Sequence, residues 1–211
     1  MGKGDEISSV RVAVRVRPLN EKETIEKSLS CVAVDHDSNQ IVVGKTKSFR
    51  YDYAFDIGDS QQQIYDTAVK KLIDNVFEGY NATIFAYGQT GSGKTYTMGT
   101  AFSSVNEDSE DIGIIPRVVD DIYRKIDEEK AHAEFLVRCA YLEIYNEQIR
   151  DLLSPKTDPR TIKLREDDSN IQIIGIKEEV ATNKDELLHY LEKGGYYRTT
   201  GFFLYFFGRF F

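Results

Sequence analysis

The glycine-rich segment from Gly88 to Thr95 limits what this chain can fold into more than any other feature. It matches the pattern G-x-x-x-x-G-K-[ST] at every fixed position. A loop of this kind turns consecutive backbone N–H groups toward an anion, and the N-terminus of the following helix adds the positive end of its dipole. The pattern therefore predicts a site for nucleoside triphosphate, with phosphate contacts from Gly88, Gln89, Thr90, Gly91, Ser92, Gly93, Lys94 and Thr95.

Two side chains of this loop are expected to have separate roles in binding the nucleotide. Lys94 supplies a point charge to the β- and γ-phosphates, and the Thr95 hydroxyl is the expected ligand of Mg²⁺. Magnesium-ATP is the expected cofactor pair. A flexible glycine-rich turn with an incidental lysine is the alternative. A dinucleotide loop that began at Gly91 is excluded, because it would need glycine where Tyr96 stands.

The surrounding pattern predicts an α/β fold. Residues 83–87 are β-branched and aromatic, which predicts a buried strand that leads into the loop. Residues 10–17 alternate valine with other residues, which predicts a strand with a buried valine face. Ser60 and Gln63 have the spacing of a capping box, and the helix they begin is expected to end at Gly79. Helices that alternate with strands indicate a mixed sheet flanked by helices, of the P-loop NTPase type.

Further elements are expected on both sides of this unit. Short strands near residues 31–34, 41–43 and 49–53 suggest a small meander. Pro116 suits the first turn of a helix, and residues 135–145 are apolar on both faces, as in a central strand. A hairpin is expected at 162–165 and 171–176, and a last helix is expected after a cap by Thr182 and Asp185.

Composition narrows the class of protein. With 211 residues, the chain is long enough for one domain with a core, and its net charge of −8 argues against a general nucleic-acid binder. No apolar secretion signal follows the N-terminus, so a cytosolic protein is the default. Cys31 and Cys139 are expected to be buried reduced thiols. The three histidines are isolated, so no metal is assigned to His36, His132 and His189.

Four segments together resemble the kinesin motor domain. They occur in that family's order and spacing, and the resemblance covers about residues 10 to 200. The chain is most similar to the chromosome-associated kinesins of the kinesin-4 type. The segments are Val14–Asn20, Gly79–Gly99, Gly113–Arg117 and Tyr141–Leu153.

The resemblance implies an ATP-binding, microtubule-stimulated motor of the cytoplasm and cytoskeleton. A chromosome-associated type would also work in the nucleus or on the spindle. By position, Arg15, Arg17 and Pro18 match the adenine-side motif of the family, and Tyr96 would stack on the base. Stacking of arginine on a flat π surface is physically reasonable. Two arginines on a solvated strand face are the alternative.

The resemblance also implies a contact with tubulin. Residues 153–165 match a loop and hairpin that touch tubulin in the family, where Lys156, Arg160 and Lys163 would meet the acidic microtubule surface. An ordinary solvated loop is the alternative. No catalytic role follows for residues 141–153. Neither a membrane nor a nucleic acid is expected as a direct partner.

The sequence departs from the family near its end. The expected organisation is a disordered N-terminus at 1–9, the N-terminal part of a motor domain at 10–201 and an aberrant aromatic tail at 202–211. This tail holds half of all twelve phenylalanines, which suggests a frameshift, a retained intron or a gene-model error. A membrane anchor is the less favoured interpretation of this tail, because a transmembrane span needs about 20 apolar residues.

The expected motor domain is therefore incomplete at its C-terminus. It lacks switch I, switch II, the main microtubule-binding helix and the oligomerisation region, so no complete catalytic set is assigned and ATP turnover is left open. The alternative function is a non-motile remnant that binds nucleotide or microtubules without turnover. A third interpretation, a P-loop ATPase of another family, must treat the four matching segments as coincidence.

Overall fold

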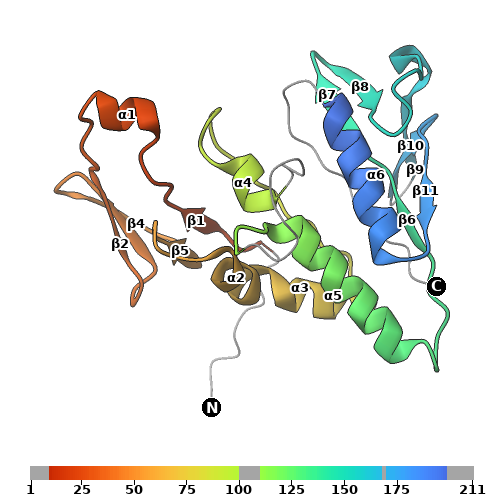
Figure 1. Cartoon of the computed structure of the whole chain (residues 1–211), viewed down its shortest axis with the longest axis horizontal. Helices are drawn as coiled ribbons and strands as arrows, with labels where there is room; N and C mark the ends of the chain where they lie inside the picture. Colours follow the sequence, from red (N-terminus) through yellow and green to blue (C-terminus); the bar gives the residue numbers. More distant parts are fainter. Residues whose placement is uncertain (1–9, 100–109, 168–169, 199–211) are drawn as a thin grey trace.

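The computed structural model describes residues 10–99, 110–167 and 170–198 (Figure 1). The disorder predicted for 1–9 and the aromatic tail predicted for 202–211 lie outside these ranges. Within them, a small β lobe with helix α1 stands at one side, a group of helices lies in the middle, and a second group of strands with helix α6 lies at the other side.

The N-terminal lobe is the predicted meander with one helix. Strands β2, β3 and β4 form an antiparallel three-stranded sheet, while β1 and β5 pair in parallel. Helix α1 begins with a capping box between Asn20 and Glu23, which satisfies the free N–H groups of its first turn. The bounds are β1 Ala13–Arg15, α1 Glu21–Ile25, β2 Val32–Asp35, β3 Gln40–Val43, β4 Lys47–Arg50 and β5 Tyr53–Phe55.

The middle helices flank the glycine-rich loop. The predicted capping box of Ser60 and Gln63 is confirmed, and the helix it begins contains a π-helical turn before it ends. Gly79 is left-handed with φ 93°, as expected past a helix end. The elements are α2 Gln61–Ile64, the π-helical η1 Tyr65–Val69, α3 Lys70–Phe77, α4 Lys94–Met98 and α5 Ile114–Glu129.

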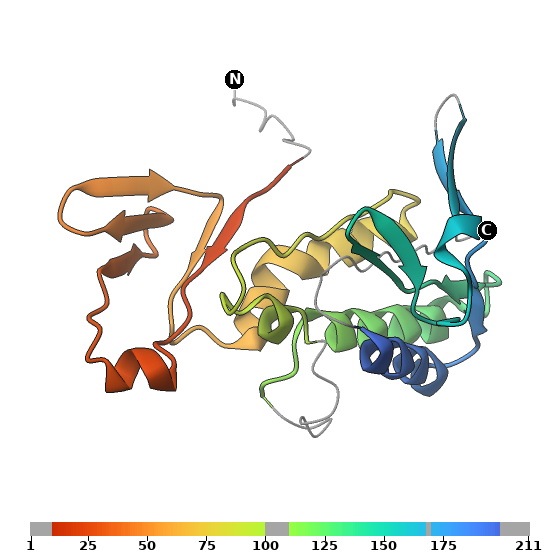
Figure 2. The same cartoon turned by 90° about the horizontal axis from the view of Figure 1, so that it is seen from above.

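The C-terminal part combines three antiparallel strand pairs with one helix. The predicted hairpin is confirmed as β9 and β10, and it projects from the rest of the molecule (Figure 2). Helix α6 is capped by Asn183, not by Thr182, because the Asn183 side chain accepts from the Glu186 N–H. The bounds are β6 Val137–Cys139, β7 Leu142–Tyr145, β8 Gln148–Asp151, η2 Pro159–Thr161, β9 Lys163–Asp167, β10 Asn170–Ile174, β11 Glu179–Ala181 and α6 Lys184–Tyr197.

The core lies where the middle helices meet helix α6 and the C-terminal strands. Val119 of α5 and Leu187 of α6 are each 0% exposed. Tyr141 packs against Gly194 so closely that a Cβ on this glycine would lie 2.0 Å from Tyr141 Cδ1. None of the described helices combines the length and apolar character that crossing a membrane requires.

A second close contact joins the ends of the segment between α4 and α5. A Cβ built on Gly99 would lie 2.7 Å from Gly113 Cα, and one built on Gly113 would lie 2.2 Å from Gly99 N. Gly99 also has φ 76°, a conformation that favours glycine. Both positions therefore need a residue without a side chain.

The strand predicted for residues 83–87 does not form. These residues have no regular structure, and Phe85 and Tyr87 are 74% and 101% exposed. β-propensity reflects packing against neighbouring strands, and no described strand pairs with this segment. The described strands accordingly form five small sheets with mixed pairing. The segment predicted as one strand at 135–145 is divided between β6 and β7.

Two expectations of burial are also wrong. Val10 and Val12 are 68% and 49% exposed, because β1 is only three residues long and begins after them. Cys31 is exposed beside the edge of the meander, whereas Cys139 is buried as expected. The apolar residues that follow Cys31 belong to strand β2. No described element covers Cys31 itself, so its thiol stays exposed.

Candidate nucleotide site

Three glycines give the loop between residue 88 and helix α4 its shape. Gly88, Gly91 and Gly93 have φ values of 154°, 77° and 98°, which side chains rarely allow. Gly93 is the N-cap of α4. A Cβ on Gly88 would lie 2.4 Å from Ser92 Oγ, so a larger residue there would fill the space that the loop encloses. The sequence pattern thus corresponds to a backbone that only glycine adopts easily.

Ser92 places an unsatisfied hydroxyl in this loop. Its Oγ is buried and has no hydrogen-bond partner among the described residues. Its N–H donates to Gln89 O at 3.1 Å, which tightens the turn. A buried hydroxyl without a partner is costly, so this position suits a ligand with acceptor oxygens.

The two side chains expected to act on the nucleotide lie in the first turn of α4. Lys94 Nζ donates to Gly88 O at 2.7 Å and to Gln89 O at 2.8 Å, so the ammonium group lies against the loop backbone. Thr95 is the next residue of the helix and is half-buried. Lysine, the free N–H groups of the helix start and a neighbouring hydroxyl form a donor set suited to phosphate.

Arg15 and Tyr96, predicted for the adenine side, come together in the structure. The guanidinium carbon of Arg15 lies 5.0 Å from the centroid of the Tyr96 ring. Arg15 Nη1 also donates to Gln61 Oε1 and to Thr97 Oγ1, each at 2.9 Å. Burial lowers the pKa of Arg15 from its ordinary value, although the guanidinium stays charged. The pair therefore presents a flat cation and an aromatic ring beside the start of α4.

Arg17 and Pro18 take different positions. Arg17 forms a bidentate ion pair with Glu23 at 2.6 and 2.7 Å and also donates to Pro18 O at 2.8 Å. The base of its side chain lies beside the loop, since a Cβ built on Gly93 would lie 3.9 Å from Arg17 Cβ. Pro18 is exposed. The structure thus places Arg17 beside the loop with its charge already paired.

Gln61 is part of this site, and the sequence reasoning missed it. It is 3% exposed, and its Nε2 donates to Tyr96 O at 2.7 Å and to Asp111 O at 3.3 Å. The Tyr96 hydroxyl in turn donates to Asp111 Oδ1 at 2.7 Å. The only sequence signal was its place directly after the Ser60 cap, which predicts a helix start and no contact with the loop.

Lys156, Arg160 and Lys163, predicted to meet tubulin, are all exposed. Arg160 belongs to η2, where it pairs with Asp158 at 2.6 Å, and Lys163 begins the projecting hairpin of Figure 2. The structure thus sets three cations on one continuous stretch of surface chain after β8.

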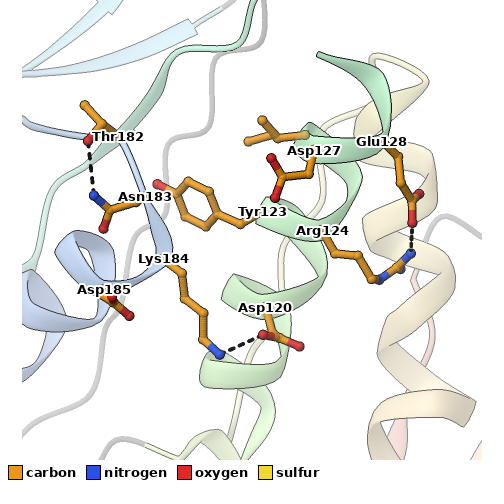
Figure 3. Close-up of a pocket in the computed structure, with 10 residues that line it drawn as sticks. Asp120, Tyr123, Arg124, Asp127, Glu128, Thr182, Asn183, Lys184 and Asp185 are labelled. Carbon is orange, nitrogen blue, oxygen red and sulfur yellow. Dashed lines mark hydrogen bonds and ion pairs between the residues drawn. The ribbon is translucent and has the colours of Figure 1, made fainter. Parts of the chain in front are cut away.

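A separate hollow between α5 and α6 shares no residue with the loop. The ion pair of Lys184 with Asp120 at 2.7 Å crosses it, and Tyr123 lies between the two helices, where its hydroxyl donates to Ala181 O at 3.0 Å (Figure 3). Its charged groups are largely paired with one another. Within the described ranges, no group of three His, Cys, Asp or Glu residues is placed to hold a metal ion.

Comparisons with known proteins agree on one family. The model of the kinesin motor domain matches residues 15–203. The chain is 44% identical over 214 residues to kinesin-like protein KIF21B of Mus musculus, with 94% of this chain and 13% of the relative covered. It is 45% identical over 191 residues to chromosome-associated kinesin KIF4A of Homo sapiens, with 90% and 15% covered.

A solved structure of a fast kinesin has the same fold. It superposes with a TM-score of 0.82 and 34% identity, over 90% of this chain and 53% of that chain. This likeness confirms the predicted α/β fold class, despite the missing ladder at residues 83–87. The chain spans about half of that solved chain and, in the two curated relatives above, 13% and 15% of their length.

Proposed function

We propose, since this chain belongs to the kinesin motor family, that it forms the nucleotide-binding part of an ATP-driven, microtubule-based motor. The observation that carries this proposal is the glycine-rich loop, with the buried Ser92 hydroxyl that bonds to no described residue inside it and the Arg15–Tyr96 pair beside it. The phosphates of a nucleotide would bind the loop, and its base would bind beside the Arg15–Tyr96 pair.

The residues of the loop fit magnesium-ATP. The free N–H groups at the start of α4, Lys94 and the Ser92 hydroxyl would hold the phosphates, because all of them donate hydrogen bonds. Thr95 would hold Mg²⁺ through its hydroxyl. When bound, the ion neutralises charge on the β- and γ-phosphates. Lys94 would exchange its bonds to the loop carbonyls for bonds to phosphate oxygens.

The base would lie against the Arg15–Tyr96 pair. Arg15 is held by Gln61 and Thr97, so its plane is fixed before a base arrives. Arg17 and Pro18 would border the same region from the chain between β1 and α1. Because Arg17 is paired with Glu23, we expect it to contribute shape and position more than free charge.

Tubulin is the proposed filament partner. The exposed cations Lys156, Arg160 and Lys163 would meet its acidic surface, and the place of work would be the microtubule cytoskeleton. The fast kinesin structure is described together with its interactions with microtubules, and KIF4A is chromosome-associated. These relatives favour a motor over the non-motile remnant considered from the sequence.

Release of inorganic phosphate from ATP, with and without microtubules, tests this function. A motor part that completes its cycle gives a rate that rises with microtubule concentration. A variant with Lys156, Arg160 and Lys163 all changed to alanine should need more microtubules for half of that rise. ATP binding without any microtubule-stimulated release would instead support a non-motile nucleotide-binding role. Failure to bind ATP would overturn the proposal.

A further inference from the structure

One buried side chain joins the three segments that border the base side of the site. Gln61 in the first turn of α2 is 3% exposed and makes three hydrogen bonds through its carboxamide. Its oxygen accepts from Arg15 of β1, and its nitrogen donates to the backbone of Tyr96 in α4 and of Asp111 before α5. The amide orientation is fixed, since only oxygen can accept from a guanidinium.

The hydrogen bonds of Gln61 hold both members of the Arg15–Tyr96 pair. The pair itself is separated by 5.0 Å from guanidinium carbon to ring centroid. Gln61 holds the guanidinium at one end and the Tyr96 backbone at the other, with bonds of 2.9 and 2.7 Å. The Tyr96 hydroxyl is held as well, by Asp111 at 2.7 Å. Arg15 also donates to Thr97 Oγ1, one residue further along α4, so Gln61 and Thr97 together join Arg15 to this helix. Among the described residues, only Gln61 bonds to both the Arg15 guanidinium and the Tyr96 backbone.

We propose that Gln61 is a positioning residue for the base of the bound nucleotide, which sets the spacing between Arg15 and Tyr96. This inference rests on the proposed function, because it needs nucleotide at this site. It assigns Gln61 no contact with the phosphates, since its three bonds all lead to the base side. Loss of Gln61 should therefore weaken recognition of the base and leave recognition of the phosphates unchanged.

The test compares two ligands on the same variant. ATP carries both base and phosphates, whereas magnesium tripolyphosphate carries phosphates alone. Gln61→Met keeps the length of the side chain and removes all three hydrogen bonds. We expect it to weaken ATP binding about tenfold, the scale of a lost hydrogen bond to a charged group, and to leave tripolyphosphate binding within about twofold. Competition against a ribose-labelled fluorescent ATP reports both affinities on the full chain.

The matched control is Gln62→Met, on the same helix turn. Gln62 is exposed, and its side chain bonds to Asp66 and Arg117 and not to Arg15 or Tyr96. It should leave both affinities unchanged. Gln61→Glu keeps an acceptor for Arg15 but cannot donate to the carbonyl oxygens of Tyr96 and Asp111. Its ATP affinity should lie between those of Gln61→Met and the unchanged chain, and its tripolyphosphate affinity should stay within about twofold of the unchanged chain, a split between the two ligands that a merely structural role would not predict.

The outcomes separate this inference from the proposed function. Equal loss of both ligands in Gln61→Met, or no loss of either, would overturn the positioning role. If Gln61→Met does not fold, Gln61→Glu decides, since the proposal still requires it to change ATP affinity more than tripolyphosphate affinity. If the unchanged chain binds neither ligand, the proposed function itself fails.

Discussion

The guanidinium of Arg15 lies over the ring of Tyr96, 5.0 Å from the ring centroid, although the two residues belong to different elements. A planar cation over an aromatic ring is attracted by the quadrupole of the ring. Two hydrogen bonds from the same nitrogen, to Gln61 and Thr97, keep the plane in place. Arg15 therefore contributes the planar shape of its guanidinium to this contact as well as its charge.

Arg15→Lys should therefore weaken ATP binding, although it keeps the charge. Lysine carries no planar group and cannot reproduce the stacked, forked geometry. We expect a loss of about three- to tenfold in ATP affinity, the scale of a weakened cation–π contact and one lost hydrogen bond. Titration with labelled ATP measures it. Unchanged affinity would show that the plane of Arg15 plays no part in binding.

Lys94→Ala should remove most of the triphosphate affinity. A hydrogen bond to a charged group is worth roughly 1.5–3 kcal/mol, which corresponds to roughly one to two decades in the dissociation constant. Lys130→Ala is the control, because this exposed lysine pairs with Asp127 away from the loop. Isothermal titration with magnesium-ATP compares the two. If Lys94→Ala bound as well as the unchanged chain, the loop would not be the phosphate site.

The Arg17–Glu23 pair predicts a dependence of stability on pH. The hydrogen bonds from Arg17 lower the pKa of Glu23 from its ordinary value of 4.5 to about 2. A lowered folded-state pKa gives stability that is present above about 4.5 and is lost as pH falls toward about 2. Glu23→Gln keeps the capping box and removes the charge.

The measurement is urea unfolding of both chains at pH 6 and at the lowest pH where they still fold. Glu23→Gln should be less stable than the unchanged chain at pH 6, and the difference should shrink at the lower pH. A constant difference across this range would mean that the charge of Glu23 does not stabilise the fold.

Gly194→Ala should destabilise the chain. Its methyl group would lie 2.0 Å from Tyr141 Cδ1, inside the packed contact between α6 and the strand region. Overpacking costs about 1–3 kcal/mol, whereas alanine gains about 1 kcal/mol in helix propensity, so the clash decides. Gly58→Ala is the control, since a Cβ there would meet no atom of the described residues within 4 Å. Thermal unfolding with a lower midpoint for Gly194→Ala alone is the expected result.

The two cysteines should differ in reactivity. Cys31 is exposed, whereas Cys139 is buried and burial raises the pKa of its thiol to about 11. At pH 7 a maleimide should label Cys31 within minutes and reach Cys139 only after unfolding. Mass spectrometry of Cys31→Ser checks this, because that variant should stay unlabelled until denaturant is added. Equal labelling of both thiols in the folded chain would contradict the core described around Cys139.

The sequence was sufficient for features that depend on neighbours along the chain. The glycine pattern predicted the loop, and Ser60 with Gln63 predicted the start of α2. Gln61 could not be found this way, because its partners lie 35, 46 and 50 residues away in the sequence. Only the fold brings an amide in α2 to an arginine in β1.

Strand predictions failed where a partner strand decides the outcome. Phe85 and Tyr87 have high strand propensity, yet they form no ladder with any described strand and are exposed. Cys31 has apolar neighbours and is exposed for a related reason, since burial requires a second layer. Propensity is local, whereas burial and pairing are properties of the whole arrangement.

The close approach of Gly99 to Gly113 has a consequence for how this region can be altered. Because the two backbones touch, the segment that joins α4 to α5 leaves and returns at one point. The number of residues between the glycines can then change without pulling either helix out of place, and doubling the length of such a loop costs only about 0.6 kcal/mol in closure entropy. A reporter peptide inserted between Gly99 and Glu110 should leave the nucleotide site undisturbed, because it spares the bonds of Asp111 to Gln61 and Tyr96. A side chain added at either glycine would force the two backbones apart.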